Sequence, residues 1–453
     1  LEFFFMRGCC NRIWVINFFL FLTIQNVVLV SSGNSVIRDT EIESIIKKIS
    51  IPILDVANIS PDSVRFYLIN KNEINAFVAG GQKIFLTTGL VRSTQSPNQL
   101  LGVMAHEIAH ISAGHLIRLR GELAKSNNTA LVAQMFGAAL SLLSGNPQFL
   151  AAAANGGVHI AHRSLLKFSR TQEQSADQAA VKYMDKAGFS SLGMLEFLQM
   201  LQGQNLLSEV TQDPYVQTHP LTKERISFVK EHVKNSKYTD LRLPKKIRSQ
   251  HARMVAKLDA FLSPPGKIFK KYFRKPKSPI AHYSLAIAHH RNADFKKAIS
   301  SINTLIADFP KDPFYMEIKG QILFENSKIK EALLAYKKAV AMLPDAPLLR
   351  ISLAHTMLET NSANVLTEAR VHLRYAVLKD NQIPLAWRLL ATTNGRIGDF
   401  GLSALASAEY NLLINRNKEA FQQANRAIKL LKRGEPAWLR SHDIITQINP
   451  KFD

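Results

Sequence analysis

Five consecutive residues, His106-Glu107-Ile108-Ala109-His110, place two imidazoles and a carboxylate at a spacing suited to hydrolytic chemistry. If this stretch is helical, the two histidines lie four residues apart on one face, within reach of a single metal ion. Glu107 flanks that face, where it can accept a proton from a water activated by the metal and pass it to a leaving amine. The pattern therefore predicts one Zn²⁺ per chain and the hydrolysis of peptide bonds, with Glu107 as the catalytic base.

A catalytic zinc site needs a third protein ligand. In metzincins that ligand is a histidine six residues beyond the motif, but Leu116 occupies this position here. His115 is nine residues from His106, so we expect it on the opposite side of the helix, away from the metal. Glu173 and Asp177 are one helical turn apart, so one carboxylate can bind the metal while the other holds a ligand imidazole. We therefore predict three zinc ligands, His106, His110 and Glu173, with Asp177 behind them.

The elements that must position these residues are visible in the local pattern. Ser96, Pro97 and Gln99 have the types and spacing of a capping box, which predicts a helix from Ser96 to about Leu119. Upstream, the segments 64–70 and 83–87 are rich in strand formers, and Gly80-Gly81 indicates a turn between them. Further helices are predicted at 129–143, 149–154, 164–187 and 192–206. The expected class is α+β, mainly helical, with a small antiparallel sheet.

From Pro279 onward the chain repeats itself every 34 residues. Pro313 and Pro347 have this separation, and so do Ala298 and Ala332. The pattern resembles the tetratricopeptide repeat, in which paired antiparallel helices stack on their neighbours. Two later units, starting near Pro347 and Pro384, are more degenerate. We predict an α-solenoid with a concave binding surface over residues 279–453.

The first 32 residues are typical of a secretory signal. Arg7 and Arg12 precede an apolar stretch that runs to Val30 and is followed by Ser31-Ser32. An uncleaved membrane anchor is the alternative interpretation. The formal net charge of +22 would suit nucleic acid, but a secreted chain is not expected to meet it. We therefore divide the chain into a signal peptide (1–32), a zinc metalloprotease domain (33–240), a basic linker (241–278) and the repeats (279–453).

The basic linker has an unusual composition. It carries twelve Lys or Arg residues and one acid, Asp259, with Pro264-Pro265-Gly266 in its middle. We interpret it as an interdomain connection with one amphipathic helix. Its KIFKKYFRK run (267–275) mixes aromatic and cationic side chains, which suits anionic lipid or nucleic acid, although such runs are more often solvated faces. Peripheral membrane contact is therefore one interpretation of this run.

About residues 40–235 resemble the gluzincin family that includes the heat-shock protease HtpX and the CAAX prenyl proteases. The matching segments, besides the zinc helix and the pair Glu173 and Asp177, are Asn75-Ala76-Phe77, Gly80-Gly81, Gly89-Leu90, Thr218-His219-Pro220 and Arg225-Ile226. The resemblance implies that Asn75 and Phe77 bind a substrate strand, with the 83–87 edge open to it. It also implies that His219 and Arg225 lie near the metal, stabilising an oxyanion or occupying the open zinc position at rest. From the residues alone, His219 could equally be a loop histidine and Arg225 an ion-pair partner.

A signal in front and tetratricopeptide repeats behind resemble the arrangement of this family's periplasmic members. That implies a zinc-dependent endopeptidase of a Gram-negative envelope that degrades misfolded or stalled outer-membrane proteins. The repeats would bind clients or the outer-membrane β-barrel assembly machinery. A periplasmic chaperone or scaffold with latent protease activity is the alternative. The chain lacks the several membrane spans of HtpX and the prenyl proteases, so a prenylated or membrane-embedded substrate is not expected.

Overall fold

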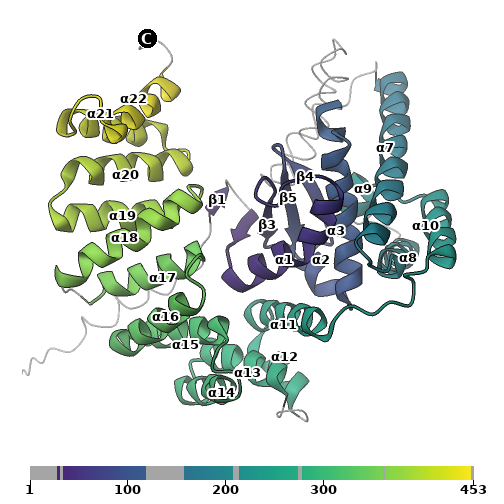
Figure 1. The fold of residues 1–453 in the computed structure, drawn as a ribbon, viewed down its shortest axis with the longest axis horizontal. Coiled ribbons are helices and arrows are strands. Elements are labelled where there is room, and N and C mark those ends of the chain that lie inside the picture. The colour runs from purple at the N-terminus through teal and green to yellow at the C-terminus, as the bar shows by residue number, and fades with distance from the viewer. Residues whose placement is uncertain are drawn as a thin grey trace, which may run out of the picture.

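The computed structural model describes residues 28–30, 34–118, 158–207, 214–273, 278–360 and 363–449. A mixed α/β part with a small sheet and an arc of helix pairs lie side by side, and helices α11 to α14 join them at one end (Figure 1). Most of the predicted signal and the predicted helices at 129–143 and 149–154 lie outside the described residues. Within them, no helix is both long and apolar enough to cross a bilayer.

The sheet is mixed, which corrects the predicted antiparallel arrangement. Its strands, in the order β1-β2-β3-β5-β4, are β1 (Val28–Val30), β2 (Asn34–Ile37), β3 (Arg65–Ile69), β5 (Lys83–Thr87) and β4 (Ala76–Ala79). The tight turn at Gly80-Gly81 folds β4 back antiparallel onto β5, and β5 therefore runs parallel to β3. As a result β5 is paired on both sides, and the predicted open edge at 83–87 was wrong: on this side the described sheet ends in β4. The first strand, β1, also lies within the segment assigned to the signal and pairs with β2.

Seven helices are described around the sheet: α1 (Thr40–Val56), α2 (Thr88–Ser93), α3 (Pro97–Ser112), α7 (Val158–Lys186), α8 (Leu192–Leu207), α9 (Pro214–Thr218) and α10 (Lys223–Asn235). Helix α3 begins at the predicted capping box, where Ser96 accepts from the Gln99 backbone and the Gln99 side chain accepts from Gln95. Helix α3 can cross α8 closely because Gly102 has no side chain. A Cβ at this position would fall 2.6 Å from Met194. The side chains between α1, α3, α8 and the sheet form one continuous core.

The predicted zinc helix ends earlier than expected. Helix α3 stops at Ser112, and Gly114 adopts a left-handed conformation with φ of +62°. A side chain at that position would be strained, so the glycine ends the helix and redirects the chain. This places His115 outside the helix, and the expectation that it lies on the opposite helical face was wrong.

The helical part consists of stacked antiparallel pairs, which confirms the predicted tetratricopeptide-like solenoid. Its pairs are α13 (Pro279–Arg291) with α14 (Phe295–Asp308), α15 (Pro313–Glu325) with α16 (Ile329–Met342), α17 (Pro347–Leu358) with α18 (Ala363–Lys379), α19 (Pro384–Ile397) with α20 (Phe400–Leu413), and α21 (Asn417–Leu430) with α22 (Pro436–Ile448). The recurring prolines occupy the first helical position of the leading helix in four pairs. There the missing N–H costs nothing. Between α15 and α16 a small residue faces a large one: a Cβ on Gly320 would meet the Tyr336 ring at 3.0 Å.

The predicted basic linker forms two helices rather than one, α11 (Lys245–Leu262) and α12 (Pro265–Tyr272). Helix α11 packs between the two parts of the molecule, and its cations neutralise acids at the start of α1. Lys257, 1% exposed, lies 2.7 Å from Asp39 and 3.2 Å from the fully buried Glu41. Arg253 pairs with the same Glu41 and, at 2.5 Å, with Asp312 of the solenoid. The basic charge of this segment is therefore partly structural.

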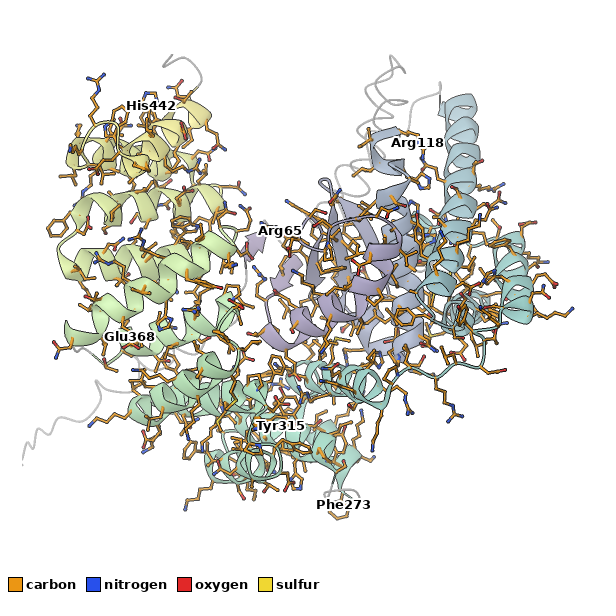
Figure 2. All side chains as sticks on the ribbon, in the orientation of Figure 1. Arg65, Arg118, Phe273, Tyr315, Glu368 and His442 are labelled. Atoms are coloured by element: carbon orange, nitrogen blue, oxygen red, sulfur yellow. The ribbon has the colours of Figure 1, made fainter. Side chains whose placement is uncertain are left out.

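Two further contacts tie the solenoid to the mixed α/β part. Tyr283 of α13 donates a hydrogen bond to Glu41 Oε2 at 2.6 Å. Farther along the solenoid, after α18, Asp380 accepts from Arg38 Nη2 at 2.8 Å and from Arg65 Nη1 at 3.0 Å. Arg65 is seen between the sheet and the arc of helices in Figure 2. Separating the two parts would leave several of these charged side chains without their partners.

Glu317 of α15 contacts Thr40 at the start of α1, and its ionisation is expected to make this contact between the two parts sensitive to pH. Burial raises its pKa to about 7, although Lys257 opposes the shift, and Thr40 Oγ1 donates to its Oε1 at 2.6 Å. Because the pKa is raised on folding, the stability it contributes is complete below its unfolded value of about 4.5 and is lost as the pH rises through about 7. We expect Glu317→Gln to remove this loss, so that its Tm falls less than that of the wild type between pH 5 and pH 8. Parallel thermal melts of both proteins over that range would show no difference if Glu317 were ionised throughout.

Candidate active site

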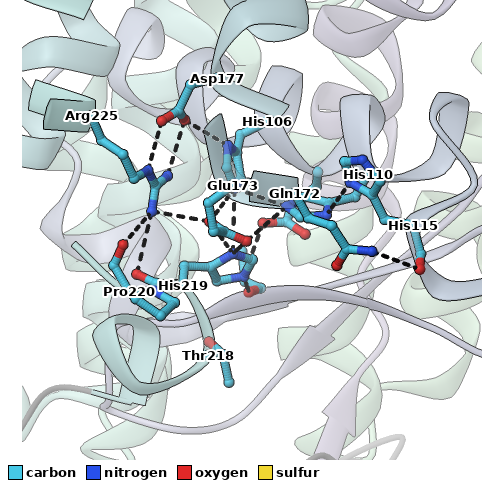
Figure 3. A network of polar contacts seen from close by, with 12 residues as sticks. His106, His110, His115, Gln172, Glu173, Asp177, Thr218, His219, Pro220 and Arg225 are labelled. Carbon is cyan, nitrogen blue, oxygen red and sulfur yellow. Dashed lines mark hydrogen bonds and ion pairs between the residues drawn. The ribbon is translucent and has the colours of Figure 1, made fainter. Parts of the chain in front are cut away.

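Four donor side chains from three parts of the chain meet at one point. His106 and His110 come from α3, Glu173 from α7 and His219 from the residue after α9 (Figure 3). One donor atom from each lies within 4.8 Å of all the others. The Nε2 atoms of His106 and His110 are 3.0 Å apart, and the Glu173 carboxylate oxygens lie 3.2 Å and 3.3 Å from them. Two imidazoles and a carboxylate with converging lone pairs form a set that divalent zinc favours.

Asp177 and Arg225 fix the ring of His106 on the side opposite the other donors. Asp177 Oδ1 lies 2.9 Å from His106 Nδ1, which leaves the Nε2 of that ring directed at the other donors. Arg225 donates to Asp177 through Nε at 2.6 Å and through Nη2 at 3.0 Å. Burial alone would raise the pKa of Asp177, but its bonds to His106 and Arg225 outweigh burial and hold that pKa below its usual value. Asp177 therefore stays ionised and keeps the His106 ring in one orientation.

Arg225 also braces the turn that carries His219. Its Nη1 donates to the Pro220 carbonyl at 3.0 Å and lies 3.0 Å from Glu173 Oε2. Burial would raise the pKa of Glu173, but the charges of His219 and His106 outweigh burial and hold it well below its usual value. The buried site thus contains three carboxylates, Glu107, Glu173 and Asp177, against one guanidinium. With the histidines neutral, as metal binding requires, this surplus of negative charge suits a divalent cation.

The Glu107 carboxylate shows that these residues fit a metal and its water. Both of its oxygens are buried, and neither has a hydrogen-bond partner among the described residues. The nearest imidazole nitrogen, His219 Nε2, is 3.5 Å away. Because an unpaired buried carboxylate is costly, this arrangement makes chemical sense when a water lies between Glu107 and a metal held by the histidines.

Comparison with known proteins agrees with this geometry. Residues 37–233 match the model of peptidase family M48. These residues are an M48 metallopeptidase domain. The whole chain is similar to the putative beta-barrel assembly-enhancing protease of Vibrio cholerae, with 27% identity over 93% of this chain and 86% of that protein. It is 25% identical to the beta-barrel assembly-enhancing protease of Escherichia coli K12, over 88% and 81% of the two chains. The mitochondrial metalloendopeptidase OMA1 of Schizosaccharomyces pombe matches 40% of this chain and 49% of its own, at 28% identity.

The residues predicted to bind substrate lie on or beside the open edge of the M48 sheet. Asn75 precedes the edge strand β4, is 2% exposed, and accepts from Thr218 Oγ1 at 3.4 Å. Phe77 lies within β4 and stacks on Phe85 with ring centroids 5.1 Å apart. The Ala76 carbonyl of the same strand is 3.2 Å from His219 Nε2. The structure thus brings Asn75 and the β4 backbone to the donor cluster, whereas Phe77 packs against its neighbouring strand.

Sequence reasoning missed two residues of the M48 site. Tyr215 is 2% exposed and stacks on His219 with ring centroids 4.6 Å apart. Its position one helical turn before His219 was the available signal. His115 was dismissed as a ligand, and the structure does not include it in the donor cluster. However, its Nδ1 lies 3.0 Å from the Nδ1 of His110, on the far side of that ring from Glu173.

His115 is placed to orient His110 as Asp177 orients His106. When His110 binds a metal through Nε2, its Nδ1 carries a proton and needs an acceptor. Burial and the adjacent His110 lower the pKa of His115 to about 4, so His115 stays neutral and its Nδ1 can accept. We expect His115→Ala to weaken zinc binding about 10- to 100-fold, the usual effect of losing such an orienting group.

The measurement is zinc affinity by competition with a chelator. His115→Asn, whose amide oxygen can still accept, should recover part of the lost affinity. Gln172→Ala is the matched control, because Gln172 donates to the His115 backbone carbonyl and not to its ring. Unchanged zinc affinity in His115→Ala would show that His110 is oriented by other groups.

Proposed function

We propose that the chain is a zinc-dependent endopeptidase of the bacterial envelope, with one Zn²⁺ held by His106, His110 and Glu173. The observation that carries the proposal is the convergence of these three donors beside a buried Glu107 that lacks a hydrogen-bond partner among the described residues. When bound, the metal would activate water and polarise the scissile carbonyl. Glu107 would accept a proton from the attacking water and deliver it to the leaving amine.

The substrate would bind as an extended strand along β4. This strand is an edge of the described sheet, and its Ala76 carbonyl lies 3.2 Å from His219 of the donor cluster. A peptide added to that edge forms main-chain hydrogen bonds, which hold it largely independently of sequence. Asn75 would fix the start of this edge through its contact with Thr218, and Arg225 would keep His219 beside the reacting carbonyl. Such binding suits unfolded segments rather than folded surfaces.

His219 supports a second proposal, that the resting enzyme is gated. Its Nδ1 lies 3.1 Å from Glu173 Oε2 and 3.3 Å from His106 Nε2. Four protein donors complete the tetrahedral coordination of zinc, and catalytic sites normally leave one position open. His219 would therefore have to leave before a substrate carbonyl could enter, after which it could stabilise the oxyanion. In the closed state the chain would act as a scaffold or chaperone with latent protease activity.

The proposed clients are misfolded or stalled outer-membrane proteins in the periplasm of a Gram-negative bacterium. The support is that the similarity to proteins named beta-barrel assembly-enhancing proteases covers 86% and 81% of their lengths and 93% and 88% of this chain, and so extends into its repeats. The solenoid would hold clients or the β-barrel assembly machinery beside the active site, which raises the local client concentration. A cleaved signal or an uncleaved inner-membrane anchor would both place the site in this compartment.

The direct test is digestion of an unfolded outer-membrane β-barrel protein and of casein, with and without chelator. We expect slow cleavage that a chelator stops and added Zn²⁺ restores. His219→Ala should cleave faster than the wild type if the histidine closes the resting site, and more slowly if its main role is to stabilise the oxyanion. Cleavage that is insensitive to chelator, or no cleavage of either substrate by wild type and His219→Ala, would contradict the proposal.

A further inference from the structure

One end of helix α12 presents a basic and aromatic surface that the proteolytic site does not use. We call it the α12 tip and define it as the residues Lys267, Lys270, Lys271 and Phe273. Phe273 directly follows the helix and is 83% exposed, more than any other large hydrophobic residue that the structure describes. The three lysines are also exposed. Leaving a phenylalanine in water is unfavourable, so this side chain requires an explanation.

Packing fixes the orientation of the α12 tip. The opposite face of the helix is anchored, because Ile268 is 1% exposed and Phe269 lies against His289 with ring centroids 4.8 Å apart. Lys270 and Lys271 follow Lys267 at helical spacings of three and four residues, so the lysines share the outward face. Phe273 comes three residues after Lys270 and extends that face. The exposure is therefore imposed by the fold.

The charge of the α12 tip is largely uncompensated. Asp259, the single acid between residues 241 and 278, pairs with both Arg92 and Lys271 at 2.9 Å. Within the part of the chain that the structure describes, Lys267 and Lys270 have no acidic partner. This differs from Arg253 and Lys257 of the preceding helix, whose charges are neutralised inside the joint. The net charge of +22 thus has an exposed component here.

The α12 tip also protrudes from the molecule. Figure 2 shows Phe273 beyond the ribbon, at the extremity where α11 to α14 join the two parts. Helices α21 and α22 and the first turns of α7 lie at the opposite end (Figure 1). A protruding aromatic ring flanked by lysines is complementary to a flat anionic surface with an apolar interior. An acidic peptide would instead need a groove to bury its own side chains.

We propose that the α12 tip binds the anionic surface of a phospholipid bilayer, with Phe273 inserted at the boundary between headgroups and acyl chains. Lys267 and Lys270 would contact headgroup phosphates, and Lys271 would stay paired with Asp259. The membrane would then hold the molecule by the region around α11 to α14, and α21, α22 and the first turns of α7 would lie at the end away from the lipid. This interaction is independent of peptide hydrolysis.

The test is flotation of the full-length protein, purified from the soluble fraction of producing cells, with lipid vesicles. One vesicle set contains phosphatidylcholine alone, and in the other about a third of the lipid is phosphatidylglycerol. We expect binding to the anionic vesicles only, weakening as salt is raised. Phe273→Ser should weaken binding about tenfold. The pair Lys267→Glu and Lys270→Glu should weaken it more than tenfold, because each lysine near such a surface contributes about fivefold.

Two matched controls separate this site from general positive charge. Leu378→Ser removes another apolar side chain that is 82% exposed. The pair Lys328→Glu and Lys330→Glu makes the same charge change at the exposed start of α16. Both controls should bind vesicles like the wild type, and all variants should keep the wild-type rate of peptide hydrolysis.

The proposal is overturned if the wild type does not float with anionic vesicles, or if the control pair weakens binding as much as the pair in α12. It is also overturned if Phe273→Ser binds undiminished. If both the wild type and Phe273→Ser bound soluble poly-glutamate more tightly than anionic vesicles, the partner would be an acidic protein instead.

Discussion

Glu107→Gln is expected to reduce kcat for peptide hydrolysis by about 10²- to 10⁴-fold, the usual contribution of a positioned acid-base group. The amide keeps the size of the carboxylate but cannot accept a proton from the attacking water. Both Glu107 oxygens are buried without a hydrogen-bond partner among the described residues, so the neutral amide should not disturb an existing bond. Metal content and Tm should therefore stay at wild-type levels.

The measurement combines steady-state cleavage of a short peptide, metal analysis and a thermal melt. Glu224→Gln is the matched control, because Glu224 is an exposed acid in the first turn of α10, next to Arg225. It should retain full activity. Near-normal turnover in Glu107→Gln would instead assign the role of base to another group, for which His219 is the nearest candidate.

Glu173→Ala is expected to lose most of the bound zinc and, with it, all measurable hydrolysis. Glu173 is the single carboxylate in the donor cluster, and its two oxygens reach both histidines of α3. Without it, the site would keep three imidazoles beside Arg225, a set that carries less negative charge for a divalent ion. Apo protein should also melt at a lower temperature, because bound metal stabilises only the folded state.

Zinc per chain is measured after dialysis, with Gln174→Ala as a control from the adjacent position on α7. His106→Ala should behave like Glu173→Ala. If Glu173→Ala retained its full zinc content, His219 would have to be counted as a permanent ligand in its place, and the gating proposal would fail with it.

The chemistry of the site was predictable from sequence because it depends on local spacing. The histidines of α3 and the pair Glu173 and Asp177 are each one helical turn apart, and a helix fixes which side chains share a face. The capping box at Ser96 gave the start of α3 for the same reason. The period of 34 residues gave the solenoid, since each helix pair buries its face only against its neighbours.

What escaped prediction depends on contacts between distant residues. The parallel pairing of β3 with β5 follows from where β4 folds back, which strand composition does not specify. From composition alone the basic segment at 241–278 resembles a solvated linker, because its acidic partners Asp39 and Glu41 lie more than two hundred residues before Lys257. The contact of His115 with His110 was not predictable, because it depends on Gly114 ending the helix just before it. In each case the decisive partner is remote in sequence or lies beyond a backbone turn.

The solenoid is fastened to the catalytic part at two separated points, the α11 joint and the Asp380 contact with Arg38 and Arg65. A solenoid attached at one point could rotate about that point, whereas two separated attachments restrict such rotation. While Asp380 stays paired, a hinge at α11 alone cannot carry the repeats away from the active site. Loss of the Asp380 carboxylate would remove the second attachment, so this acid is expected to limit the relative motion of the two parts.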